Sequence, residues 1–114
     1  MAEQIKLLIV DDMEWAYEVA KLKLDKKCII DYAKTERQAL KKIKENNYEI
    51  VLTDYYLGKR SQKGGLKIIL AAKDKGLKTI LMSKENHKKE AVEMGVNFVF
   101  KKNFPKSIKI SRNL

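Results

Sequence analysis

Three aspartates stand at the ends of apolar runs in this sequence. Asp11 and Asp12 close the run at residues 7–10, and Asp54 closes the run at residues 50–53. Apolar runs of this length, rich in β-branched residues, are typical of strands buried on both faces of a parallel sheet. Because parallel strands of an open sheet end at a common edge, we expect the three carboxylates to meet in one pocket.

A cluster of three carboxylates predicts a cation. Carboxylates packed together repel one another and raise one another's pKa unless a positive charge joins them. Their oxygens are the ligands that hard divalent ions prefer, and Mg²⁺ in proteins is commonly held by carboxylates together with the phosphate groups of a substrate. The pattern therefore indicates a magnesium site and phosphate chemistry.

The rest of the sequence supplies the elements that must position these residues. Strands are predicted at residues 5–10, 28–32, 48–53, 78–82 and 96–100, and helices at residues 13–24, 35–45, 65–75 and 85–94. Thr35 and Gln38 form a capping box at the start of the second helix, and Gly76 and Gly95 end the last two. This alternation predicts one α/β domain over residues 1–114, a doubly wound parallel sheet with helices on both faces.

Composition narrows the class of protein. The 114 residues are 45% hydrophobic, which suits one domain with its own core. The longest apolar run, at residues 68–72, is far too short for a membrane span, and the N-terminus lacks the pattern of a signal peptide. The short apolar runs predict no membrane association. The single Cys28 cannot form an internal disulfide, so we expect a cytoplasmic protein.

The positive charge is unevenly distributed. The net charge is +10; residues 1–58 carry ten Lys or Arg and eleven Asp or Glu, whereas residues 59–114 carry fifteen and four. A basic half allows binding of nucleic acid or of an acidic partner. Solvated basic faces explain it equally simply, and the sequence has neither an aromatic RNA-binding signature nor a zinc finger, so nucleic acid is the less favoured partner.

Five ordered features make the chain resemble the receiver domain of two-component response regulators. They are Val10-Asp11-Asp12, Asp54, Gly65-Leu66, the Ser83 that ends Ile80-Leu81-Met82-Ser83, and a lysine after Phe100. The similarity covers residues 5–104. It implies a flavodoxin-like fold with five parallel strands in the order 2-1-3-4-5.

The resemblance also implies a function. Asp54 would accept a phosphoryl group from a sensor histidine kinase, a phosphotransfer protein or a small phosphodonor. Asp12, Asp54 and the backbone carbonyl of Tyr56 would bind Mg²⁺, with Asp11 acting largely through water, while Ser83 and the lysine would bind phosphoryl oxygens. Such a domain signals through a downstream protein partner, and its only chemistry is self-catalysed phosphoryl transfer and slow autodephosphorylation.

Two lysines compete for the position after the fifth strand. Counting from Gly95 without a gap favours Lys102. Lys101 stays open, because alternation along a strand sends neighbouring side chains to opposite faces. With Lys102 in the site, Val99 rather than Phe98 takes the place of the aromatic residue that the family uses as a switch on this strand.

The end of the chain departs from the family. A fifth helix is expected to be short or missing: Pro105 suits the start of a helix, whereas Ile108 and Ile110 alternate with polar residues as in a strand. Apolar surface left uncovered there would invite a partner or a second copy, so we expect a monomer or a weak dimer.

Other functions fit parts of the pattern. The same fold could be a pseudo-receiver, a constitutive protein-interaction module in which the acidic cluster is a relic. A basic nucleic-acid-binding domain is the third possibility. His87, the single histidine, lies among charged residues and is interpreted as a surface residue.

Overall fold

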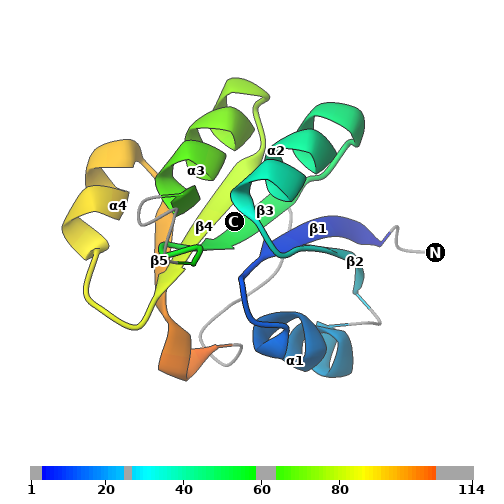
Figure 1. Ribbon diagram of the computed structural model, residues 1–114, viewed down its shortest axis with the longest axis horizontal. Helices are drawn as coiled ribbons and strands as arrows, with labels where there is room; N and C mark the ends of the chain where they lie inside the picture. Colours follow the sequence, from blue (N-terminus) through cyan, green and yellow to red (C-terminus); the bar gives the residue numbers. More distant parts are fainter. Residues whose placement is uncertain (1–3, 25–26, 59–63, 105–114) are drawn as a thin grey trace.

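A five-stranded parallel sheet forms the centre of the molecule (Figure 1). The computed structural model describes residues 4–24, 27–58 and 64–104. The strand order is β2-β1-β3-β4-β5, as the sequence predicted. The strands are β1 (Ile5–Val10), β2 (Cys28–Ala33), β3 (Ile50–Asp54), β4 (Lys78–Ser83) and β5 (Asn97–Phe100).

Helices cover both faces of this sheet (Figure 1). One face carries α1 (Trp15–Leu24), and the other carries α2 (Glu36–Glu45), α3 (Gly64–Asp74) and α4 (Lys88–Met94). A single 3₁₀ turn, η1 (Lys101–Asn103), follows β5. The expectation of a short or missing fifth helix concerns residues 105–114, which lie outside the described residues. Within the part of the chain that the structure describes, no helix is long and apolar enough to cross a membrane.

The central strand β1 is buried on both sides. Leu7 and Ile9 pack into the cluster beneath α1, whereas Leu8 and Val10 pack into the cluster beneath α2 and α3. All four side chains are completely buried. This double burial explains why the strand reads as a continuous apolar run rather than as an alternating pattern.

Strand register aligns the polar residues that follow the apolar runs. Val10 pairs with Thr53, so Asp11 lies level with Asp54 at the carboxyl edge of the sheet. Asp54 in turn pairs with Met82, which places Ser83 one residue further along that edge. The fold therefore gathers three of the predicted site residues without any long loop.

The predicted helix boundaries are partly correct. The Thr35 hydroxyl accepts a hydrogen bond from the Gln38 N–H at 3.1 Å, as expected for an N-cap. The Gln38 side chain accepts from the Lys34 N–H at 2.9 Å instead of returning to Thr35, so the capping box is shifted by one residue. Helix α4 begins three residues later than predicted, because the chain after β4 first forms a loop that reaches across the carboxyl edge of the sheet.

Gly65 fixes how closely α3 approaches the end of β3. A Cβ at this position would overlap the backbone carbonyl oxygen of Asp54 and come within 2.9 Å of the Cα of Tyr55. The Gly65 N–H also donates to the Tyr55 carbonyl at 3.2 Å. The first turn of α3 thus rests directly on the backbone that carries Asp54.

Replacing Gly65 with alanine is expected to force α3 away from this backbone. We predict that Gly65→Ala lowers the free energy of unfolding by about 1–3 kcal/mol, the usual cost of overpacking, as measured by urea denaturation. Leu70→Ala, on the exposed side of the same helix, is the control and should change stability by less than about 1 kcal/mol. Equal effects of the two substitutions would contradict this account of Gly65.

Candidate functional site

The three predicted aspartates form one cluster at the carboxyl edge of the sheet. Each of Asp11, Asp12 and Asp54 offers a carboxylate oxygen, and these oxygens all lie within 4.8 Å of one another. Asp11 is completely buried and Asp54 is 6% exposed, while Asp12 is partly buried. The structure thus brings together the residues from β1 and β3 that the sequence predicted to meet.

Lys101 supplies the positive charge of the cluster. Its ammonium nitrogen lies 2.9 Å from Oδ2 of Asp11 and donates a hydrogen bond to Oδ2 of Asp54 at 3.0 Å. The side chain is buried although it carries a full charge. An ammonium between two carboxylates explains how these buried anions are tolerated at the edge of the sheet.

The preference for Lys102 was wrong. Lys102 is exposed, and its ammonium lies 5.7 Å from the centre of the Phe100 ring. The physical reason is where β5 ends: the chain enters η1 at Lys101, and this first residue of the turn faces the acidic edge. Counting residues from Gly95 could not predict the last residue of β5 to within one position.

Replacing Lys102 with Lys101 as the site lysine also shifts, by one residue, the position expected to carry the aromatic residue of the fifth strand. Phe98 now stands three residues before the site lysine, and it packs with Tyr55, Leu81 and Ala91 on the face that α3 and α4 cover. Val99 instead belongs to the cluster on the α1 face. With Lys101 rather than Lys102 beside Asp54, the same count would give the place of the family's switch aromatic to Phe98 instead of Val99.

Burial raises the pKa values of the two buried aspartates, whereas their interactions with Lys101 lower them. Burial, with the negative charge of Asp54, raises the pKa of Asp11 from 3.8 to about 6, against the hydrogen bonds from Met13 and Lys101. Burial and the charge of Asp12 likewise raise the pKa of Asp54 despite the pairing with Lys101. For Lys101, burial alone would lower the pKa, but its bonds to Asp11 and Asp54 outweigh burial and raise it.

Tyr32 anchors the backbone of the cluster, and sequence reasoning missed it. Its hydroxyl donates to the backbone carbonyl of Asp11 at 2.7 Å, while its ring stacks on Tyr17 at 5.0 Å between centroids. The side chain of Asp11 is held in turn by the Met13 N–H, which donates a hydrogen bond to its Oδ1 at 3.1 Å. Tyr32 comes from β2, and no spacing in the sequence relates it to Asp11.

Ser83 lies completely buried at the end of β4, level with Phe100 of β5. Its hydroxyl oxygen accepts a hydrogen bond from the Glu85 N–H at 3.2 Å. A hydroxyl that accepts a hydrogen bond can still donate its own proton, so the Ser83 hydroxyl can donate a hydrogen bond to an anion bound at this edge. His87, not Ser83, occupies the N-cap of α4, so a capping role does not account for Ser83.

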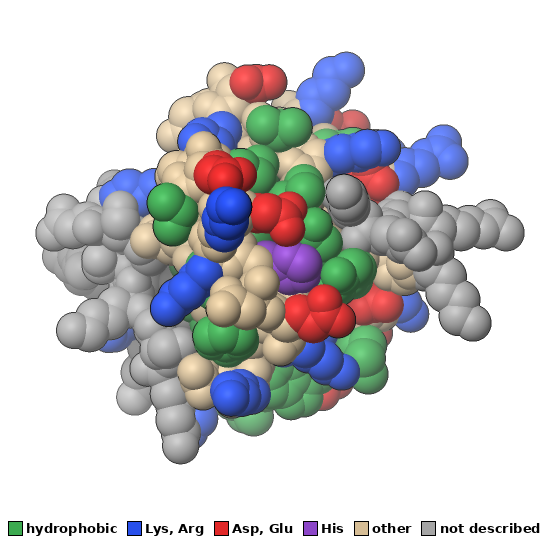
Figure 2. All heavy atoms as spheres, turned by 90° about the vertical axis from the view of Figure 1, so that its left-hand side faces the viewer, with side chains coloured by type: hydrophobic (Ala, Val, Ile, Leu, Met, Phe, Trp, Pro, Cys, Tyr) green, Lys and Arg blue, Asp and Glu red, His purple; other side chains and the backbone are tan. Residues whose placement is uncertain are grey.

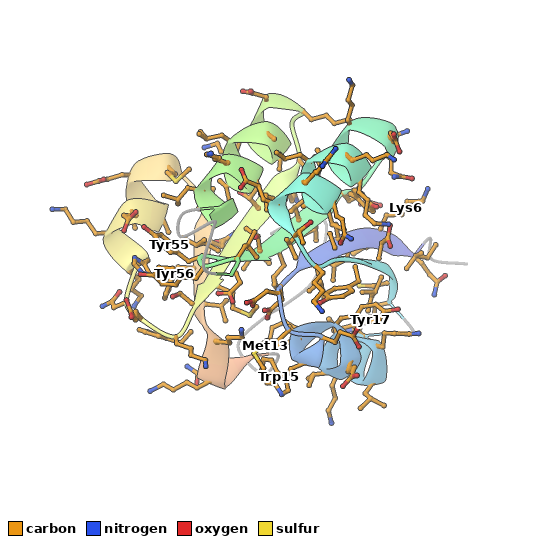
Figure 3. All side chains as sticks on the ribbon, viewed as in Figure 1. Lys6, Met13, Trp15, Tyr17, Tyr55 and Tyr56 are labelled. Atoms are coloured by element: carbon orange, nitrogen blue, oxygen red, sulfur yellow. The ribbon has the colours of Figure 1, made fainter. Side chains whose placement is uncertain are left out.

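A pocket of about 230 Å³ opens onto the cluster. It is lined by Asp12, Met13, Asp54, Tyr56, Lys84, Glu85 and Lys101. Tyr56, which is 39% exposed, lies at the mouth, where its hydroxyl donates to Oε2 of Glu85 at 3.2 Å (Figure 3). Tyr56 thus lines the pocket beside Asp54, and Glu85 is a neighbour that the sequence did not single out.

Tyr55, the residue after Asp54, contacts residues at the start of α4. Tyr55 is buried; its ring stacks on His87 at 3.7 Å between centroids, and its hydroxyl donates to Oε2 of Glu90 at 2.9 Å. The other oxygen of Glu90 lies 2.9 Å from Nδ1 of His87. The interpretation of His87 as a plain surface residue was wrong, since it links Tyr55 at the end of β3 to Glu90 of α4.

The donor set fits a hard divalent cation. Three carboxylates present oxygens within reach of one ion, and two of these carboxylates have a raised pKa that a second positive charge would lower. Asp12 and Tyr56 both line the pocket through which such an ion would enter. The residues present are thus suitable ligands for Mg²⁺.

Comparison with known proteins establishes the family. The family model described as the response regulator receiver domain matches residues 7–111. This chain belongs to that family. The receiver-domain residues named from the sequence therefore lie in a genuine receiver fold, with Lys101 in the place first given to Lys102.

Solved receiver domains share the fold. The response regulator TrrA from Thermotoga maritima, solved with Mg²⁺ and BeF, is 27% identical, with a TM-score of 0.74 and 91% coverage of both chains. A CheY-like receiver from Methanospirillum hungatei is 20% identical, with a TM-score of 0.74 over 97% of this chain and 86% of that one. A Burkholderia pseudomallei response regulator, solved with a phosphorylated aspartate and calcium, is 18% identical, with a TM-score of 0.74 over 96% and 69%. No curated protein matches the chain.

The raised pKa of Asp11 predicts a pH dependence of stability without metal. Since its folded pKa of about 6 exceeds its usual 3.8, Asp11 favours the folded state while it is protonated, and this contribution is lost as pH rises through about 6. In a chelating buffer, the stability of the wild type should therefore fall relative to Asp11→Asn by about 2 kcal/mol between pH 4 and 7.

Urea denaturation at several pH values measures this difference. The exposed Asp74→Asn variant is the control, and its stability should follow that of the wild type at each pH. A wild type and an Asp11→Asn variant with parallel pH profiles would contradict the assignment of the titration to Asp11.

Proposed function

We propose that this receiver domain accepts a phosphoryl group on Asp54 in a Mg²⁺-dependent reaction and signals through protein contacts. The observation that carries the proposal is the cluster itself. One buried ammonium bridges two carboxylates beside a third, in a pocket that reaches Asp54. Each group needed to place charge around a phosphoryl group is present at one edge of the sheet.

Each residue has a distinct task in this proposal. Asp12, Asp54 and the backbone carbonyl of Tyr56 would hold Mg²⁺, with Asp11 acting largely through water. When bound, the ion supplies positive charge to a phosphoryl oxygen. Ser83 would donate its hydroxyl proton to a second oxygen, and the Lys101 ammonium would pair with a third.

Asp54 would act as the nucleophile because its carboxylate lines the pocket. The Lys101 hydrogen bond favours the ionised form, against the effect of burial. A carboxylate that attacks phosphorus forms an acyl phosphate, which hydrolyses readily and suits a signal that must decay. Apart from this self-catalysed transfer and its slow reversal by water, the proposal assigns no enzymatic activity.

The partners follow from the chemistry. A sensor histidine kinase or a phosphotransfer protein would supply the phosphoryl group in the cytoplasm, and a downstream protein would bind the domain in its changed state. The Tyr55–His87–Glu90 contacts provide a route from the acceptor strand to α4. Phosphorylation would shift the population of α4 positions through this link.

The nucleic-acid alternative finds less support in the distribution of charge. On the face drawn in Figure 2, basic side chains lie among acidic ones rather than in one continuous patch. Single basic groups separated by carboxylates do not form the footprint that phosphate backbones require. The pseudo-receiver alternative differs from our proposal in one respect only, which is whether Asp54 accepts phosphate.

Incubation with acetyl phosphate tests the proposal directly. We expect intact-protein mass spectrometry to show one added phosphoryl group on the wild type with Mg²⁺. The gain should disappear in EDTA and in Asp54→Asn, because each removes a component of the transfer. Asp74→Asn, which replaces an exposed aspartate on α3, should retain it.

Two outcomes would contradict the proposal. Phosphorylation that persists in Asp54→Asn would place the acceptor elsewhere. A folded wild type that gains no phosphoryl group at any donor concentration would favour the pseudo-receiver.

A further inference from the structure

A second pocket, of about 340 Å³, lies beside the acidic one. It is lined by Met13, Trp15, Lys84, Lys101 and Lys102, and its walls are almost entirely apolar. Met13 is 58% exposed and Trp15 is 41% exposed, and both lie close together at the start of α1 (Figure 3). Two large apolar side chains that remain open to solvent beside a polar site indicate a binding surface.

The two pockets adjoin one another. Met13, Lys84 and Lys101 line both of them. A molecule whose phosphoryl group reached Asp54 through the first pocket would therefore place its remaining atoms along these shared walls. The second pocket provides room for those atoms.

The lining determines which atoms suit this space. The indole of Trp15 packs against the buried Phe104, with ring centroids 5.9 Å apart at 59°. An indole beside a polarisable methionine side chain favours a planar apolar ring. Lys84 and Lys102 are exposed and border the pocket, so negative charge on the occupant is also favoured.

We propose that this pocket receives the leaving group of the phosphodonor and selects donors whose leaving group carries an aromatic ring. The inference rests on the proposed phosphorylation of Asp54 and names the donor class for it. An aryl acyl phosphate has the required chemistry: a dianionic phosphoryl group joined to a ring-bearing carboxylate.

The step is balanced without any other reactant. A carboxylate oxygen of Asp54 attacks phosphorus and forms the new P–O bond, while the P–O bond to the donor carboxylate breaks. The ring-bearing carboxylate leaves with the electron pair as an anion, and no proton is transferred. Lys84 and Lys102 border the space in which that negative charge appears, whereas Lys101 remains with the phosphoryl group.

Comparison of two donors tests the selection. The second-order rate constants for phosphorylation by benzoyl phosphate and by acetyl phosphate are measured with Mg²⁺ by timed intact-protein mass spectrometry. Burial of a phenyl ring predicts that the benzoyl-to-acetyl ratio in the wild type exceeds that in Trp15→Ala about tenfold. Comparing ratios between variants cancels the different intrinsic reactivities of the two donors.

Further variants separate this pocket from a general effect. Met13→Ala should lower the ratio in the same direction as Trp15→Ala, because both remove apolar wall. Val92→Ala, which truncates an exposed apolar residue on α4, should leave the ratio unchanged. In addition, phenylphosphonate should shift the single indole N–H resonance of the wild type at lower concentration than methylphosphonate does.

The outcomes distinguish failure of the leaving-group pocket from failure of Asp54 phosphorylation. Equal ratios in the wild type, Trp15→Ala and Met13→Ala, with Asp54 still phosphorylated, would overturn the leaving-group pocket alone. Absence of phosphorylation from both donors would overturn the proposed function and this inference with it. A ratio that falls only in the two pocket variants would establish the pocket.

Discussion

The contact of Lys101 with Asp11 and Asp54 is the interaction on which the rest of the site depends. Three carboxylates clustered at the end of a parallel sheet would otherwise repel one another and take up protons. One ammonium at 2.9 Å and 3.0 Å from two of them balances part of that charge. Because one ammonium cannot neutralise three carboxylates, the pocket keeps a net negative charge, which suits a metal ion and then a phosphoryl group.

The surrounding fold serves to keep these groups in place. Parallel pairing of β1 with β3 sets Asp11 level with Asp54, and Tyr32 and Gly65 fix the backbone on either side. Tyr55 then connects this rigid edge to α4 by stacking and hydrogen bonding. A change of charge at Asp54 therefore occurs at a point that is anchored on one side and coupled to a helix on the other.

Sequence reasoning found what local signals encode. The buried strands and the meeting of the three aspartates follow from apolar runs and from the rule that parallel strands end together, whereas the strand order was implied by the resemblance to receiver domains. Lys101 could not be separated from Lys102, because the choice depends on the residue at which β5 gives way to a turn. The roles of Tyr32 and His87 depend on contacts across the fold, and neither residue has a spacing that relates it to Asp11 or Tyr55.

Amide NMR with Mg²⁺ and then beryllofluoride, a mimic of the acyl phosphate, tests the central claim most directly. We expect the wild type to show shifts that spread from Asp54 to Ser83, Lys101 and the start of α4, while Asp54→Asn stays unchanged on addition of beryllofluoride. A wild type that responds to neither reagent, or an Asp54→Asn variant that responds to beryllofluoride as the wild type does, would contradict the account.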